Sequence, residues 1–183
     1  MKEHFKSIIQ ELDTVLEGVT DHQTEALAKN LHHARRIFIA GNGRSGLAGK
    51  MFAMRLMHIG YEAYVVGETI TPSITEDDTL LIISGSGNTK TLVHYATKAK
   101  EVSATIALLT TNGESSIAEL SDTVVEIPAV TKATMGERTT IQPLGSQFDQ
   151  SAHLLLDGLI VYFMEHYVDQ NHEDLSKKHA NLE

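Results

Sequence analysis

A loop rich in serine and glycine carries the side chains best suited to holding an anion. The apolar run Leu80–Ile83 leads directly into Ser-Gly-Ser-Gly-Asn-Thr at residues 84–89, and an amphipathic segment follows. Gly85 and Gly87 let the backbone turn tightly and approach a ligand. Unpaired amides and the dipole at the start of the next helix favour a phosphate, although an ordinary capped turn has a similar composition. The loop adds hydroxyls from Ser84, Ser86 and Thr89.

A second glycine loop has two possible interpretations. Gly41-x-Gly-x-x-Gly46 follows an apolar strand, and Glu68 lies about twenty residues further on, which is the pattern of a dinucleotide-binding fingerprint. This favours a nicotinamide-dependent enzyme. Arg44 and Ser45, however, place a cation and a hydroxyl in the middle of the loop, where they suit a compact phosphate or sugar. Two hydroxyl-bearing loops facing each other favour a phosphosugar over a dinucleotide.

Hydrophobic periodicity predicts the elements that position these loops. Strands alternate with helices, which indicates a parallel sheet covered on both faces. By analogy we expect a flavodoxin-like order, 2-1-3-4-5, with ligands at the carboxyl ends of the strands. The predicted strands are 36–40, 63–66, 79–83, 105–110 and 123–127. The predicted helices are 4–16, 20–34, 47–58, 91–100, 115–120, 152–167 with a start near Ser146 or Asp149, and 173–179, and an irregular loop is expected over 135–143.

Length and composition restrict the class of protein. The chain has 183 residues, 42% of them hydrophobic and 21% charged, which fits one globular α/β domain. It has no cysteine and no signal-peptide pattern or long apolar run, so we expect a cytoplasmic protein without membrane contact. The net charge of −9 argues against a nucleic-acid partner.

Six motifs together resemble the 6-phospho-3-hexuloisomerases, a family with the sugar isomerase (SIS) fold. The motifs are Gly-Asn-Gly-Arg-Ser-Gly (41–46), Phe-Ala-Met-Arg-Leu-Met-His (52–58), Val-Gly-Glu (66–68), Ser-Gly-Ser-Gly-Asn-Thr (84–89), Gln-Pro-Leu-Gly-Ser (142–146) and His-Ala-Asn-Leu-Glu (179–183). The resemblance implies a single SIS domain over residues 1–183, with helices in 1–34 and 146–183 packing on the sheet and at subunit interfaces. It also implies a homotetramer that converts a phosphorylated 3-ketose into fructose 6-phosphate without a cofactor.

The resemblance also assigns roles to individual residues. It implies phosphate binding by the loop at 84–89, with help from Ser45. The predicted substrate-binding residues are Gly43, Arg44, Ser45, Ser84, Gly85, Ser86 and Thr89. The acid-base carboxylate falls on Asp149, after Phe148, where relatives usually have glutamate. Because aspartate is one methylene shorter, either the backbone moves in or the proton transfer belongs to His179 or Glu68.

Each catalytic candidate has a simpler alternative. Asp149 could cap the long helix that begins near it. Glu68 could pair with Arg55 or Arg44. His179, the candidate for opening the fructose ring, could be a solvated histidine.

Two further patterns have simple interpretations. The adjacent His32 and His33 make a poor chelate on a helix, so no metal site is predicted. Met51, Met54 and Met57 are expected in the core or at a subunit interface.

The main alternative function is a phosphosugar sensor without catalytic activity. Aspartate in place of glutamate is a change that a sensor could tolerate. We expect the enzyme instead, because the sequence carries no helix-turn-helix segment or basic surface that would transmit a signal.

Overall fold

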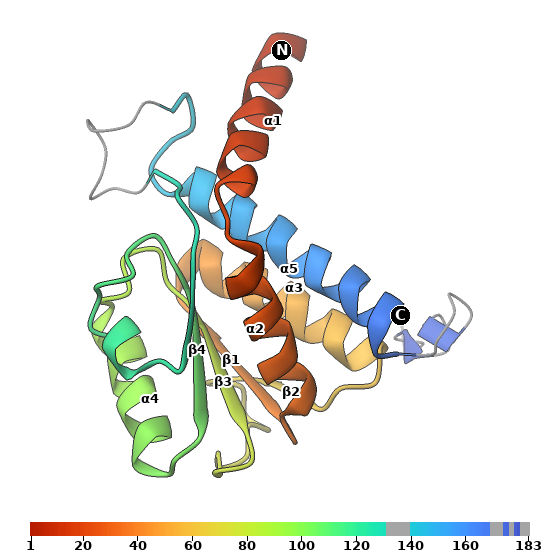
Figure 1. Ribbon diagram of the computed structural model, residues 1–183, viewed down its shortest axis with the longest axis vertical. Helices are drawn as coiled ribbons and strands as arrows, with labels where there is room; N and C mark the ends of the chain where they lie inside the picture. Colours follow the sequence, from red (N-terminus) through yellow and green to blue (C-terminus); the bar gives the residue numbers. More distant parts are fainter. Residues whose placement is uncertain (131–139, 169–173, 176–177, 180–183) are drawn as a thin grey trace.

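The computed structural model describes residues 1–130, 140–168, 174–175 and 178–179. Within these ranges a single parallel sheet has the strand order β2-β1-β3-β4-β5, which confirms the predicted flavodoxin-like order (Figure 1). The strands are β1 (Ile37–Gly41), β2 (Ala63–Val65), β3 (Thr79–Ile83), β4 (Thr105–Thr110) and β5 (Thr123–Glu126). The order reverses between β1 and β3, so the loops after these two strands open beside each other.

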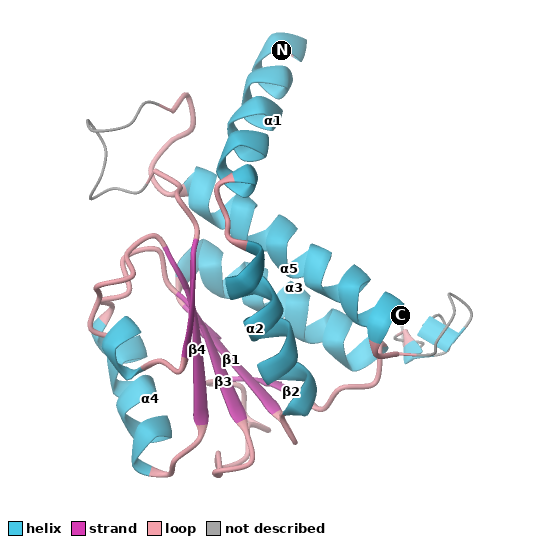
Figure 2. Ribbon diagram, in the orientation of Figure 1, coloured by secondary structure: helices cyan, strands magenta, loops and turns pink. Residues whose placement is uncertain are grey.

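Helices cover both faces of the sheet, as Figure 2 shows. One face packs against α2 (Asp21–His33), α3 (Gly43–His58) and α5 (Ser146–His166), and the other against α4 (Lys90–Glu101) and the short 3-10 helix η1 (Ala118–Leu120). Alternate side chains of each strand enter opposite cores: Ile39 lies in the first and Phe38 in the second. The remaining helix, α1 (Lys2–Glu17), runs from the start of α5 away from the sheet.

Two element boundaries differ from the predicted ones for visible reasons. Helix α3 begins at Gly43 rather than at Leu47, because two glycines let the chain pass directly from strand to helix. A Cβ on Gly46 would lie 2.4 Å from the carbonyl oxygen of Gly41, so no side chain fits there. The predicted helix at 115–120 is reduced to η1, because the amides of Ser116 and Ile117 donate to the neighbouring loop at Asn88 and Gly87.

Parts of the other predictions fall outside the described residues. Residues 135–139 of the expected irregular loop do so, as do 173, 176 and 177 of the expected last helix. None of the helices in the described ranges combines the length and apolar character needed to cross a bilayer.

Candidate active site

The two glycine loops meet at the carboxyl edge of the sheet. Gly41 at the end of β1 pairs in register with Ile83 at the end of β3, so the loops leave the sheet side by side. The Asn42 side-chain amide donates to the Thr91 hydroxyl at 3.0 Å and joins the start of α3 to the start of α4. The N-termini of two helices therefore open on one space, where their unpaired amides favour an anion.

Asp149 lies against the first loop. Its Oδ1 accepts a hydrogen bond from the Ser45 hydroxyl at 2.7 Å, and its Oδ2 accepts one from Arg44 Nε at 3.0 Å. The Asp149 side chain is 13% exposed, whereas that of Arg44 is 61% exposed. The structure thus brings the predicted site residue Asp149 together with Arg44 and Ser45, which precede it by more than one hundred positions in the sequence.

Asp149 is not the cap of α5. The N-cap position is Gly145, and the amide of Asp149 donates to the carbonyl oxygen of Gly145 as part of the first helical turn. The alternative that Asp149 serves as the helix cap is therefore wrong. A carboxylate in this first turn still interacts favourably with the helix dipole.

The second loop is held from inside by its own hydroxyl. Ser84 is buried, and both its carbonyl oxygen and its Oγ accept from the amide of Gly87, at 3.1 and 3.2 Å. Gly87 has φ +64°, and a Cβ there would lie 1.9 Å from the Ser115 hydroxyl. Ser86 is exposed and Thr89 is the N-cap of α4. Ser84 therefore shapes the loop, while Ser86 and Thr89 lie nearer its surface.

The sequence interpretation missed several residues that hold this loop. Gly85 offers its carbonyl oxygen to the hydroxyls of Thr110 and Thr111, and the Asn88 side chain accepts from the amide of Ser116. These contacts join the second loop to the segment after β4. A signal was present, because Thr110 ends the next predicted strand, Thr111 follows it, and the carboxyl ends of parallel strands meet at one edge of the sheet.

Glu68 lies near the same edge of the sheet, after β2, but its partner differs from the expected one. Its carboxylate pairs with Lys50 of α3, and both side chains are about half exposed. The expected pairing with Arg55 or Arg44 is wrong, because Arg44 pairs with Asp149 and Arg55 contacts His58. Such an exposed ion pair contributes little to stability.

His179 lies at the opposite end of α3. Its ring stacks on that of the buried His58, with ring centroids 5.4 Å apart. The two rings border a cavity of about 520 Å³ between the ends of α3 and α5. Burial, followed by the charge of Arg55, lowers the pKa of His58 below its ordinary value. Since α3 begins at Gly43 and rises about 1.5 Å per residue, His179 lies roughly 20 Å from Arg44 and Ser45 within one chain.

Similar proteins place this arrangement in a family. Residues 30–151 match the SIS domain. The chain belongs to the SIS domain family. It is 42% identical to the 3-hexulose-6-phosphate isomerase of Bacillus subtilis, over 99% of this chain and 98% of that one. These matches confirm the predicted single-domain α/β fold and the resemblance that the motifs indicate.

Solved structures and a regulator add to the comparison. A crystal structure of a Methanococcus jannaschii protein, which infers a molecular function of 3-hexulose-6-phosphate isomerase, has a TM-score of 0.85 and 32% identity over 99% of both chains. An uncharacterized HTH-type transcriptional regulator of Clostridium perfringens is 34% identical over 49% of this chain, which is 34% of the regulator. Sequence similarity to this chain thus extends from named isomerases to part of a longer regulator.

Proposed function

We propose that this SIS protein isomerises D-arabino-3-hexulose 6-phosphate to D-fructose 6-phosphate, the second step of ribulose monophosphate formaldehyde fixation. Likeness to the named isomerases extends over nearly the full length of the chain. The observation that carries the proposal is the Asp149 carboxylate, which Ser45 and Arg44 hold beside two anion-binding helix N-termini. A base next to a phosphate site is what isomerisation of a phosphorylated ketose requires.

Asp149 is proposed as the base. Moving the carbonyl from C3 to C2 requires removal of the C2 proton, an enediol-type intermediate and return of a proton at C3. One carboxylate can serve both carbons. The Ser45 hydrogen bond fixes the orientation of Asp149, which is how a positioned base gains efficiency.

Arg44 is proposed to change partners when the substrate binds. The Arg44 side chain is 61% exposed, although that of its partner Asp149 is only 13% exposed, so the guanidinium has room to turn away from the carboxylate. A turn of the guanidinium toward the substrate would free Oδ2 of Asp149 to accept the proton. The same movement would place a positive charge beside the developing enediolate.

The loop at 84–89 is proposed to hold the phosphate. Thr89 and the first amides of α4 face the space that the first loop also borders, and Gly43, Gly85 and Ser86 leave the backbone open to a ligand. His179 remains the proposed ring-opening group for fructose 6-phosphate. Its distance from Ser45 within one chain means that this role requires a second copy of the chain.

The assembly is proposed to be a homotetramer in the cytoplasm. Four apolar side chains of α3 are more than 40% exposed and lie on its outer side: Leu47, Met51, Met54 and Met57. The alternative that the three methionines belong to the core is therefore wrong. An exposed apolar stripe of this kind is typical of an interface.

The sensor alternative has less support than the enzyme. The regulator resembles this chain over only part of its own length, whereas the isomerase of Bacillus subtilis matches it almost end to end.

The decisive experiment is an assay of the purified protein with 3-hexulose 6-phosphate and no added cofactor. We expect fructose 6-phosphate to form and, in deuterated water, to carry deuterium at C3, where the proton returns. Tight binding of fructose 6-phosphate without turnover or proton exchange would instead establish the sensor. Turnover that depends on added NAD or NADP would support the dinucleotide alternative.

A further inference from the structure

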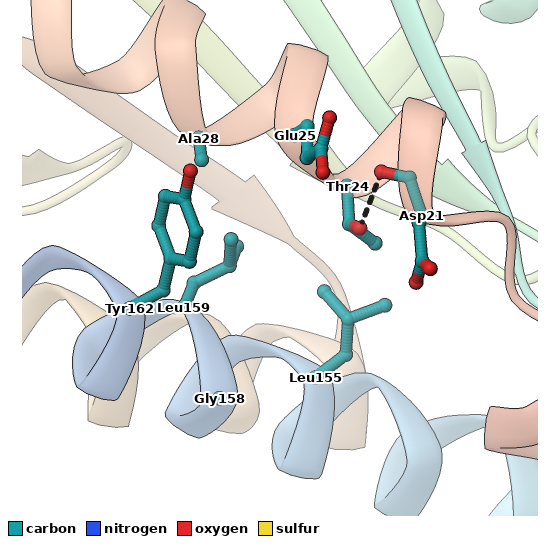
Figure 3. Close-up of a pocket in the computed structure, with 8 residues that line it drawn as sticks. All are labelled: Asp21, Thr24, Glu25, Ala28, Leu155, Gly158, Leu159 and Tyr162. Carbon is teal, nitrogen blue, oxygen red and sulfur yellow. Dashed lines mark hydrogen bonds between the residues drawn. The ribbon is translucent and has the colours of Figure 1, made fainter. Parts of the chain in front are cut away.

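Asp149, the proposed base, lies in the first turn of α5, while the middle of that helix packs against α2. Leu155 and Leu159 point toward Ala28 of α2 and belong with it to the buried core (Figure 3). Apolar contacts are not directional, so they join α5 to the sheet without orienting its first turn. A catalytic side chain must be held within about 0.5 Å of its working geometry. Directional contacts at the start of α5 are therefore required to place Asp149.

Glu11 of α1 supplies such contacts. Its carboxylate accepts hydrogen bonds from the Thr140 hydroxyl at 2.6 Å, the backbone amide of Ile141 at 2.8 Å, and the side-chain amides of Gln142 at 3.0 Å and Gln147 at 3.3 Å. Three of these donors lie in the segment before α5, and the fourth, Gln147, lies in its first turn, two residues before the proposed base. Glu11 thus ties the middle of α1 to the start of α5.

These hydrogen bonds depend on the negative charge of Glu11. Burial alone would raise the pKa of Glu11, but the hydrogen bonds from the four donors, that of Thr140 first, outweigh burial and lower this pKa below the ordinary 4.5. The carboxylate is therefore ionised at neutral pH, and hydrogen bonds to an ionised acceptor are shorter and stronger than those between neutral groups. Glu11→Gln leaves a single acceptor oxygen and turns an N–H group toward at least one of the donors.

The turn between Gln142 and α5 needs contacts of this kind to keep its shape. Leu144 has φ +56°, a left-handed conformation that residues other than glycine rarely adopt. The Gln142 side-chain oxygen is buried and has no hydrogen-bond partner among the described residues. Both features cost free energy, so the turn persists because its surroundings hold it. Glu11 contributes to this hold, since it binds the nitrogen of the same Gln142 amide.

The Asp149 carboxylate itself reaches the loop after β1, where it accepts from Ser45 at 2.7 Å and from Arg44 at 3.0 Å. Aspartate has one methylene group between its backbone and its carboxylate, so a movement of the first turn of α5 would carry the carboxylate away from both donors. We infer that Glu11 is a positioning residue for Asp149, because it holds this turn where the carboxylate reaches the loop. The inference rests on the proposed function, since it gives Glu11 a part in the same reaction.

Glu11→Gln tests the inference. We expect kcat to fall about ten- to a hundredfold, which is the loss that a displacement of about 1 Å can cause. The affinity for fructose 6-phosphate should stay close to that of the natural chain, because the loop proposed to hold the phosphate lies between β3 and α4. Amide hydrogen exchange should become faster over residues 145–151 and stay unchanged over 84–89.

Asp122→Asn is the matched control, because it makes the same change from acid to amide at the opposite edge of the sheet. The Asp122 carboxylate accepts from the backbone amide of Ile106 at 2.8 Å. We expect this variant to melt at a lower temperature but to keep its kcat. Thr140→Val, which removes one of the four donors to Glu11, is a milder second variant and should lower kcat in the same direction.

Three results would overturn the inference. The first is an unchanged kcat in folded Glu11→Gln or, if that variant does not fold, in Thr140→Val. The second is an equal fall of kcat in Asp122→Asn, and the third is unchanged hydrogen exchange over residues 145–151. A natural chain without turnover would refute the proposed function instead, and the exchange measurement would still decide whether Glu11 holds the first turn of α5.

Discussion

Asp149, the proposed base, also contacts the loop after β1. If it is the base, Asp149→Asn should fold and bind phosphosugar but lower turnover about 10²–10⁴-fold. The amide oxygen of asparagine can still accept from Ser45, so the loop should stay in place. Measuring kcat and the affinity for fructose 6-phosphate distinguishes a loss of turnover from a loss of binding. Asp149→Glu, which restores the usual family residue, should keep or raise activity.

The outcome that contradicts this assignment is near-normal turnover by Asp149→Asn. The proton transfer would then belong to Glu68 or His179. The turnover of Glu68→Gln should then be compared with that of Asp149→Asn. This variant removes the carboxylate that pairs with Lys50 and lies at the same edge of the sheet.

Two hydroxyls of the second loop, those of Ser84 and Thr89, should contribute to phosphosugar binding. Thr89→Val replaces the hydroxyl at the N-cap of α4 by a methyl group and should weaken phosphosugar binding by roughly 1.5–3 kcal/mol, or about ten- to a hundredfold. Ser84→Ala should cause a similar loss and only a small loss of stability, because the Gly87 amide keeps the Ser84 carbonyl oxygen as acceptor. Titration calorimetry and thermal melting measure the two quantities. Unchanged affinity in both variants would place the phosphate elsewhere.

The junction between β1 and α3 depends on glycine. In Gly46→Ala the new methyl group would collide with the backbone of Gly41, so we expect a loss of roughly 1–3 kcal/mol and weaker substrate binding. Gly158→Ala is the matched control, since its Cβ meets open space among the described residues and alanine favours the helix. Denaturant unfolding of both variants gives the comparison. Equal stabilities would mean that the junction adjusts freely.

At the other edge of the sheet, a buried ion pair makes the fold sensitive to acid. Burial alone would raise the pKa of Asp78, but hydrogen bonds from Arg36 and Thr75 outweigh it and hold this pKa below the ordinary 3.8. The resulting stability is present above pH 3.8 and is lost as the pH falls through the folded-state pKa. Asp78→Asn should make the free energy of unfolding depend less on pH in the acidic range. It should also lower that free energy at neutral pH by about 3–5 kcal/mol. Denaturant unfolding at a series of pH values from acidic to neutral measures both effects. An unchanged loss of stability at acidic pH in the variant would mean that other carboxylates cause that loss.

The whole molecule should respond to phosphosugars and not to dinucleotides. Fructose 6-phosphate at about 100 times its dissociation constant should add roughly 2.7 kcal/mol to stability, which a thermal melt resolves. NAD and NADP should leave the melting temperature unchanged. The loop at 84–89 lies beside the loop at 41–46, and its hydroxyls suit a single phosphate group rather than a dinucleotide. A shift with NAD alone would contradict the isomerase proposal.

Much of this molecule could be predicted from its sequence, and the remainder depended on tertiary contacts. Apolar runs predicted all five strands, because buried parallel strands have this pattern, and the strand order was expected by analogy with flavodoxin-like folds. The position of Asp149 beside Ser45 could be expected only through the family resemblance, since no local pattern joins residues so far apart. The start of α3 at Gly43 depends on the close approach of Gly46 to Gly41, and the short η1 results from contacts with the neighbouring loop. Helix propensity reflects neither of these tertiary contacts.

The long separation between Ser45 and Asp149 also sets the order of events during synthesis. These residues stand 104 positions apart, and α5 leaves the ribosome after all five strands. A growing chain can form the β1–β3 pair and both glycine loops before it acquires Asp149, the proposed base. Since closing so long a loop is entropically costly, secondary structure should return before activity in a refolding experiment. The nascent protein would then hold a phosphosugar before it could convert one.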